Sequence, residues 1–295
     1  MNSEPTSLPN RSGQDRDGLN RDYQKIDSQS DQDQAVESRF LDQEVSQFEK
    51  DGYFICRSLV PQSYVDKILR IAERDTSGEL GDIEYEADVQ YPGAPVSLHA
   101  QGGRTIRRLR QAFSRDPVFS HLVKEPFLLN RLQQLLGPEV VMPLAHHNCV
   151  MTKHPEYSSD TGWHQDIRFW SFENPNLVNI WVALGDESAS NGCLKLLPES
   201  HTQTFQKHQL DDALFYRTDL EENRALLSQE VTATLKAGDV LFFHARCFHS
   251  ATRNNSQSTK FSAVFTFRSL KNPPIAGSRS SELPELLLSQ NRQAE

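Results

Sequence analysis

The stretch Lys260-Phe-Ser-Ala-Val-Phe-Thr-Phe-Arg268 decides the fold class. Its apolar side chains at positions 261, 263, 265 and 267 alternate with those of Lys260, Ser262, Val264 and Thr266. A period of two is the pattern of a β-strand with one face in a core, because successive side chains point to opposite faces. The sequence therefore predicts a strand here, with its phenylalanines facing the main core.

Short β-like runs separated by turn residues occupy most of the chain between Pro138 and this strand. They cover residues 140–153, 177–184, 193–197, 231–235 and 240–243. Several short strands at such spacing are typical of a sandwich or a barrel. The segment 203–227 lacks the alternation, and the sequence leaves open whether it is a helix or a lid over a site.

Three apolar stripes at helical spacing precede the β region. They lie within residues 45–52, 65–72 and 128–136, and glycine or proline marks the ends of each. A short strand at 53–56 follows the first. The fold expected is mainly β, with flanking helices that form an N-terminal layer.

The domain organisation follows from composition. Residues 1–38 are rich in Asp, Gln, Ser and Arg and poor in large apolar side chains, so they predict a disordered polar tail. Residues 39–272 predict a single domain, and residues 273–295 a C-terminal tail.

Composition also bears on location and partners. No stretch approaches the roughly 20 apolar residues that span a bilayer, and no secretory signal is visible, so we expect a cytoplasmic protein without a membrane partner. A net charge of -9 argues against nucleic acid. The four cysteines form no C-x-x-C pair and predict reduced core thiols. The oligomeric state cannot be read from the sequence.

One basic cluster stands out against the acidic balance. Arg104, Arg107, Arg108 and Arg110 lie within seven residues and could meet an anionic substrate. A solvated basic face, or ion pairs with the acidic surplus, is the alternative.

The strongest chemical signal is Gly162-Trp-His164-Gln-Asp166. On an extended chain residues i and i+2 project to the same face, so both side chains can reach one cation. A second stretch, Gly238-Asp-Val-Leu-Phe-Phe-His244-Ala-Arg-Cys-Phe-His249, ends an apolar strand in histidine. His244 and His249 are five residues apart and would lie on opposite faces of an unbroken strand, so one of them is expected to serve.

Two imidazoles and one carboxylate on one metal face leave three open positions, which is what iron(II) needs for a chelating co-substrate and oxygen. Zinc accepts the same donors, but zinc enzymes usually present H-E-x-x-H or His/Cys sets, which are absent here.

These segments resemble the phytanoyl-CoA dioxygenase-like family of iron(II)- and 2-oxoglutarate-dependent oxygenases. The resemblance rests on the W-H-Q-D and G-D-x-x-F-F-H motifs, on Asn191-Gly-Cys-Leu194 with Pro198, Ser200 and His201, and on Phe48-Glu-Lys-Asp-Gly-Tyr53. It implies a double-stranded β-helix, also called a jelly roll or cupin-like fold. It also implies that His249 is the second histidine ligand, beside His164 and Asp166.

The resemblance further implies a 2-oxoglutarate site. The family's distal cation lies eleven residues beyond the second histidine, which is Lys260 here in place of arginine. Arg253 and Arg268 are the alternative anchors. Trp181 and Cys149 are other positions expected to contact the co-substrate, together with Thr252 or Ser250, because the family's small hydroxyl residue is replaced by Ala251 here. The activity implied is hydroxylation of a small molecule with molecular oxygen, with succinate and carbon dioxide released.

Two other functions stay open at this level. A non-catalytic or sensor-like metal-binding relative is suggested by Lys260 and Ala251, which depart from the family pattern. A metal-dependent hydrolase or isomerase on a cupin-like barrel is the other. The substrate itself cannot be read from the sequence.

Overall fold

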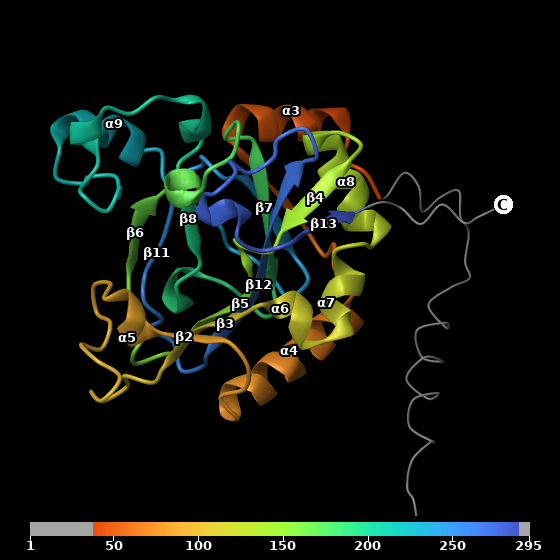
Figure 1. Ribbon diagram of the computed structural model, residues 1–295. Coiled ribbons are helices and arrows are strands. Elements are labelled where there is room, and N and C mark those ends of the chain that lie inside the picture. Colours follow the sequence, from red (N-terminus) through yellow and green to blue (C-terminus); the bar gives the residue numbers. More distant parts are fainter. Residues whose placement is uncertain (1–37, 289–295) are drawn as a thin grey trace, which may run out of the picture. The chain divides into compact units, whose positions relative to one another are not determined.

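The structure is a computed structural model, and it describes residues 38–288. Two antiparallel sheets dominate this part of the chain (Figure 1). The large sheet has the order β1 (Tyr53–Cys56), β10 (Val240–His244), β7 (Leu177–Ala183), β12 (Lys260–Ser269), β5 (Asn148–Lys153), β3 (Ile106–Arg110) and β2 (Ile83–Tyr85). Two further strands, β4 (Val140–Pro143) and β13 (Glu285–Leu288), extend it beside the end of β12.

The small sheet has four strands. Their order is β6 (Thr161–His164), β11 (His249–Ala251), β8 (Leu194–Leu196) and β9 (Val231–Thr232). Strands that follow one another in the sequence are often not paired in the sheets. In the large sheet β7 lies between β10 and β12, and in the small sheet β8 pairs with β11. This exchange of strands between two sheets is the arrangement expected of a jelly roll.

Four helices cover the outer face of the large sheet. They are α3 (Asp42–Asp51), α4 (Gln62–Ser77), α7 (Pro117–Leu122) and α8 (Pro126–Leu136). Their buried side chains join Phe265 and Phe267 of β12 in one apolar cluster. Figure 1 shows α4, α7 and α8 on the side of the large sheet away from β6 and β11. The alternation in 260–268 therefore predicted correctly which face of β12 meets the main core.

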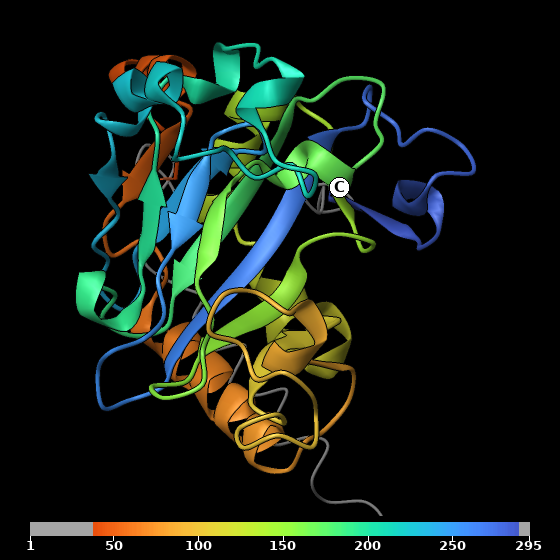
Figure 2. The same cartoon turned by 90° about the vertical axis from the view of Figure 1, so that its left-hand side faces the viewer.

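The inner face of the large sheet packs against the small sheet. Trp181 of β7 and Val264 of β12 share a second apolar cluster with Leu194 of β8 and Ala251 of β11. Figure 2 shows the strands of the large sheet side by side, with α4 below them. Side chains on this inner face are the ones that can reach a site between the sheets.

The remaining helical pieces are one or two turns long. They are α5 (Glu86–Val89), α6 (Ala112–Arg115), α9 (Arg224–Leu227) and the 3-10 turns η2 (Asp166–Phe169), η3 (Ala189–Asn191), η4 (Ser200–Thr202), η5 (Lys207–Gln209), η6 (Glu221–Asn223) and η7 (Arg279–Ser281). Segment 203–227 is thus neither a long helix nor a strand. It is a chain of turns closed by a bridge between Leu210 and Tyr216.

The three predicted helices and the strand at 53–56 are confirmed, with boundaries that differ by a few residues. One boundary was wrong. Residues 273–288 are not merely a tail, because β13 pairs in register with β4 and buries Leu288. The predicted tail at 1–38 lies outside the described residues except for Ser38, and so does 289–295. Among the described residues no helix is long and apolar enough to cross a membrane.

The turn before β10 holds the second motif in place. Gly238 has a φ of +85°, and an added Cβ would lie 2.6 Å from the backbone oxygen of Val60. The carboxylate of Asp239 accepts hydrogen bonds from the backbone amides of Ser58 and Lys236. The Gly-Asp pair of the motif therefore has a structural role, which is to join β10 to the segment after β1.

Replacing Gly238 with alanine tests that role. Gly238→Ala should lower the free energy of unfolding by about 1–3 kcal/mol, because the left-handed backbone and the close carbonyl both penalise a Cβ. The matched control is Gly185→Ala, where no heavy atom would lie within 4 Å of the new Cβ. Urea denaturation would compare the two, and equal stabilities would contradict this account.

Candidate metal centre

Two histidines meet across the small sheet. His164 ends β6, His249 begins β11, and the antiparallel register pairs them directly. Their ring centroids are 4.2 Å apart. Paired positions on neighbouring strands place their side chains on the same face, so both imidazoles point into the space between the sheets.

Asp166 completes the cluster from outside the strand. The chain leaves β6 after His164, and Asp166 opens the turn η2. One carboxylate oxygen, Oδ1, lies 3.7 Å from Nε2 of His164 and 3.6 Å from Nε2 of His249. Among the described residues these three are the group whose ligand atoms all fall within 4.8 Å of one another.

The hydrogen bonds of the two imidazoles involve Nδ1 and leave Nε2 of each ring available to bind a metal. Nδ1 of His164 lies 2.9 Å from the carbonyl oxygen of Gly162, and Nδ1 of His249 lies 3.1 Å from that of Cys247. A carbonyl oxygen can only accept, so each Nδ1 carries the proton and each Nε2 presents a lone pair to the cavity. Burial lowers the pKa of both rings and favours the neutral form that binds metals.

The large sheet holds Asp166 by its other oxygen. Asn179 of β7 donates its side-chain amide to Oδ2 of Asp166 at 2.7 Å, and Thr266 of β12 donates its hydroxyl to the Asn179 oxygen at 2.6 Å. Asn179 and Thr266 are fully buried. This relay occupies Oδ2 and leaves Oδ1 toward the histidines, so the carboxylate is set to bind a cation through one oxygen.

A third histidine, which the sequence analysis did not select, lies beside the cluster. Nε2 of His147 is 3.0 Å from Oδ1 of Asp166. Burial lowers the pKa of His147, but the charge and hydrogen bond of Asp166, together with Cys149, outweigh burial and raise the pKa to about 9. Burial also raises the pKa of Asp166, whereas His147 and His249 lower it to a net value well below the usual range. No motif points to His147, because it lies in the turn between β4 and β5.

A cavity with an empty volume of about 610 Å³ contains the cluster. Lys260 and Trp181, both expected at the co-substrate site, also line it. The cavity therefore joins the small sheet, which carries the two histidines, to the inner face of the large sheet.

Lys260 is not a lone cation in this cavity. Its Nζ donates to Oε2 of the buried Glu187 at 2.9 Å and lies 4.9 Å from the ring centre of Trp181. The other oxygen of Glu187 accepts from Ser262 at 2.6 Å and from the Trp181 indole at 2.9 Å. Glu187 could not be identified from the sequence, because 73 positions separate it from its partner Lys260 and no local pattern connects the two.

Of the other expected co-substrate residues, Ser250 lines the cavity that holds the cluster, but Cys149 and Thr252 do not. Cys149 borders a second, more polar cavity, and Thr252 is exposed. Arg253 makes a surface ion pair with Asp160 at 2.7 Å. Arg268 pairs with Glu285 of β13, on the far part of β12.

His244 is directed away from the cluster. It ends β10, and its Nδ1 accepts the backbone amide of Arg246 at 3.0 Å. Its ring lies against His201, with centroids 5.3 Å apart. The two histidines of the second motif are therefore separated as expected, but for another reason: the strand is not continuous, and His244 ends β10 of the large sheet while His249 begins β11 of the small sheet.

The arginine cluster divides between the surface and the cavity. Arg104 pairs with Glu79 and Arg110 with Asp82 at the surface. Arg107 and Arg108 line the cavity. The two cavity arginines also have carboxylates nearby, since both approach Glu84 at 3.4 Å. The interpretation as ion pairs with the acidic surplus is thus supported for all four.

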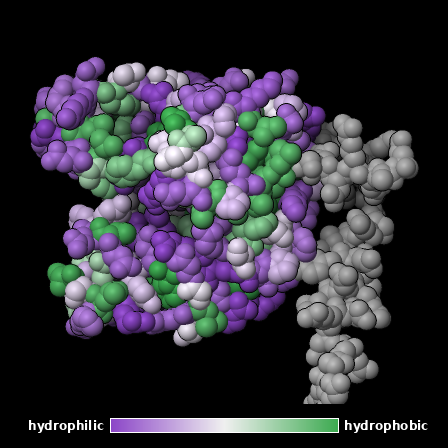
Figure 3. Space-filling model, viewed as in Figure 1, coloured by the Kyte–Doolittle hydropathy of each residue, from purple (hydrophilic) through white to green (hydrophobic). Residues whose placement is uncertain are grey.

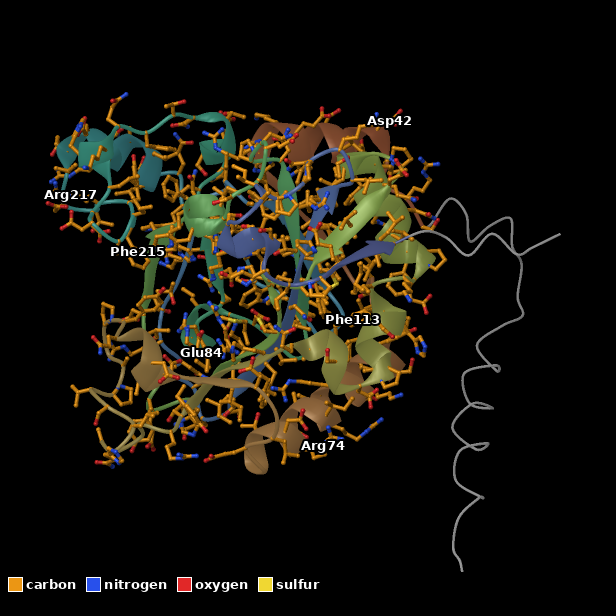
Figure 4. All side chains as sticks on the ribbon, viewed as in Figure 1. Asp42, Arg74, Glu84, Phe113, Phe215 and Arg217 are labelled. Atoms are coloured by element: carbon orange, nitrogen blue, oxygen red, sulfur yellow. The ribbon has the colours of Figure 1, made fainter. Side chains whose placement is uncertain are left out.

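Segment 203–227 covers one side of the cluster. Phe215 lies edge-on to His164, with ring centroids 5.8 Å apart, and also contacts Tyr91. Arg168 stacks on Phe215 at 4.1 Å and donates to the carbonyl oxygen of Ala213 and the hydroxyl of Tyr91. The surface is hollowed between the lobes that carry α9 and α5 (Figure 3). Phe215 and Glu84 lie on either side of that hollow (Figure 4).

The donor set fits an iron(II) ion. Two neutral imidazoles and one monodentate carboxylate form a facial triad, which leaves three coordination positions for other ligands. The cavity that contains the triad is also lined by lysine and arginine side chains, which suit an anionic chelator.

Comparisons with known proteins agree with this arrangement. The family model for phytanoyl-CoA dioxygenase (PhyH) matches residues 48–262. The ectoine dioxygenase of Bordetella parapertussis is 26% identical over 264 residues, which cover 82% of this chain and 82% of the relative. The peroxisomal phytanoyl-CoA dioxygenase of Homo sapiens is 24% identical over 221 residues, or 71% of this chain and 63% of the relative.

Solved structures share the fold. EctD from S. alaskensis with 2-oxoglutarate and 5-hydroxyectoine has a TM-score of 0.63 at 20% identity, covering 80% of this chain and 78% of that one. The epimerase SnoN with Fe³⁺, alpha ketoglutarate and nogalamycin RO has a TM-score of 0.64 at 19% identity, covering 82% and 89%. The expected cupin-like jelly roll is confirmed. Because the family model spans well over half of its length, this chain belongs to the phytanoyl-CoA dioxygenase (PhyH) family.

Proposed function

We propose that this protein is a non-haem iron(II)- and 2-oxoglutarate-dependent dioxygenase that hydroxylates a small molecule, with His164, Asp166 and His249 as its metal ligands. The observation that carries the proposal is the convergence of two Nε2 lone pairs and one carboxylate oxygen on one point of a buried cavity. Zinc would accept the same donors. Iron is favoured because the curated relatives are named dioxygenases.

The cavity suits 2-oxoglutarate as the co-substrate. Bound iron would supply the activation of oxygen, with 2-oxoglutarate converted to succinate and carbon dioxide. This chain's own residues bind and orient the co-substrate, and we propose Lys260 and Trp181 as contacts because both line the cavity. Thr252 and Cys149 stay predictions from the sequence, and their positions outside the cavity give them no support. Arg253 and Arg268 do not line the cavity, whereas Lys260 does, and this position favours Lys260 over them as a contact.

The substrate side is proposed to be a second cavity that adjoins the first through His147 and Arg108, which line both. Its wall carries arginines and carboxylates together with His146 and Trp170, which stack at 4.4 Å. This lining favours a small polar molecule over a long apolar chain. An anionic substrate remains a prediction, because Arg108 and Arg110 already face carboxylates.

The alternative, a non-catalytic or sensor-like relative, is not favoured, since the ligand triad is complete and the relatives are named as enzymes. A cytoplasmic location is proposed on the strength of the four buried, unpaired cysteines, which suit a reducing compartment.

The activity can be tested without knowing the substrate. Purified protein with iron(II), 2-oxoglutarate and oxygen should release succinate slowly, and faster with a productive molecule from a panel of small polar compounds. Succinate release and oxygen uptake are the measurements, and a reaction without iron(II) is the control. Failure of the iron-loaded protein both to bind 2-oxoglutarate and to form succinate would contradict the proposal.

The ligand assignment distinguishes His164 of the first motif from His244 of the second. His164→Ala should abolish binding of manganese(II), used as an oxygen-stable substitute, because a facial triad with one imidazole missing holds the ion weakly. His244→Ala is the matched control and should leave the affinity unchanged, since its ring contacts His201 on another side. Calorimetric titration would measure both. Equal losses would reassign the ligand.

The hydrogen-bond relay behind Asp166 makes a further prediction. Asn179→Leu removes the donor to Oδ2 at similar volume, and the affinity for manganese(II) should fall about 10–100-fold. Thr266→Val, one step further from the metal, should give a smaller loss in the same direction. Circular dichroism would establish that both variants fold. An Asn179→Leu protein with wild-type affinity would show that the relay does not orient the carboxylate.

A further inference from the structure

Two buried lysines lie at paired positions on neighbouring strands. Lys153 ends β5, Lys260 begins β12, and the register pairs them directly. Both are at most 7% exposed, and both line the cavity that holds the metal cluster. Like charges directly opposite each other in a sheet are destabilising, so this pair requires negative charge close by.

Glu187 supplies that charge for Lys260 alone. It is an ion-pair partner at 2.9 Å, fixed on its other oxygen by Ser262 and Trp181. The charge of Lys260 is therefore balanced by Glu187, and its side chain is held in place without a ligand.

Lys153 has no such partner. Its Nζ donates to the backbone carbonyl oxygen of Ser159 at 2.8 Å. Within residues 38–288 no carboxylate lies at ion-pair distance from it, whereas Lys260, Arg107 and Arg108 all have one. Among the two lysines and two arginines that line this cavity, Lys153 is therefore the one without a carboxylate at ion-pair distance.

We propose that Lys153 is a specificity-determining residue, whose ammonium binds the distal carboxylate of the co-substrate and so makes the site require a dicarboxylic 2-oxo acid. This inference rests on the proposed function. The co-substrate carboxylate completes the charge balance of the lysine pair, as the second anion beside Glu187. A buried ammonium is costly without an anion and strongly attractive to one.

The electrostatics of the ligand-free cavity agree with this role. Burial lowers the pKa of Lys153, and the charges of Arg107 and Lys260 act in the same direction against those of Glu86 and Asp160, so that the net pKa is about 7. An incoming carboxylate would reverse this effect by favouring the charged form.

The test compares two ligands that share the chelating end. 2-Oxoglutarate carries the distal carboxylate, and 2-oxopentanoate has the same chain length but ends in a methyl group. Calorimetric titration of each into the manganese(II)-loaded full chain needs no turnover. Lys153→Met keeps the length and the apolar stem of the side chain but removes its charge. Lys195→Met is the control, since Lys195 pairs with Glu230 away from this cavity.

Lys153→Met should weaken the binding of 2-oxoglutarate by about tenfold to a hundredfold and leave that of 2-oxopentanoate within about twofold. Lys195→Met should change neither. Unchanged binding of 2-oxoglutarate by Lys153→Met would overturn the inference, and so would a parallel loss of both ligands, because that would mean a structural role. If the wild-type protein does not bind 2-oxoglutarate at all, the proposed function fails instead, and this subsite with it.

A second measurement needs neither metal nor co-substrate and covers the case in which a variant folds poorly. Lys153→Met removes an uncompensated charge, so the thermal midpoint of the ligand-free protein should rise. Lys260→Met leaves Glu187 buried without its cation, so the midpoint should fall. A clear fall for Lys153→Met, equal to that of Lys260→Met, would overturn the inference.

Discussion

The direct pairing of His164 with His249 across β6 and β11 is the constraint on which the rest of the site depends. It sets the spacing of the two imidazoles, and the backbone carbonyls of Gly162 and Cys247 set their tautomers. A slip of one residue between these strands would turn one of the rings to the opposite face.

Much of the fold could be predicted from local pattern. The alternation in 260–268 and the three apolar stripes reflect periodicities of the chain itself, and the structure confirms them. Strands β2 and β3 were missed because they are short and rich in charge, and β13 because its pairing with β4 joins distant parts of the sequence. Polar strands become visible only when their partners are known.

The site was predictable to a similar degree. His164 and Asp166 were expected to meet because alternate residues of a strand share a face. They do meet, but for another reason, since the chain leaves the strand at Gln165 and Asp166 is turned back by Asn179. His147, Lys153, Asn179 and Glu187 carry no motif. Their proximity arises from the pairing of β5, β7 and β12, which no local pattern in the sequence specifies.

The division of labour between the two sheets has a mechanical consequence. The histidines belong to the small sheet, whereas the lysine pair and the anchor of Asp166 belong to the large sheet. A co-substrate that chelates iron at one end and contacts the lysines at the other would span the space between the two sheets. The gap between them is filled by a thin apolar layer that includes Leu194 and Val264. The thickness of that layer sets the separation of the two sheets, and this separation limits the length of the 2-oxo acid that the enzyme can hold.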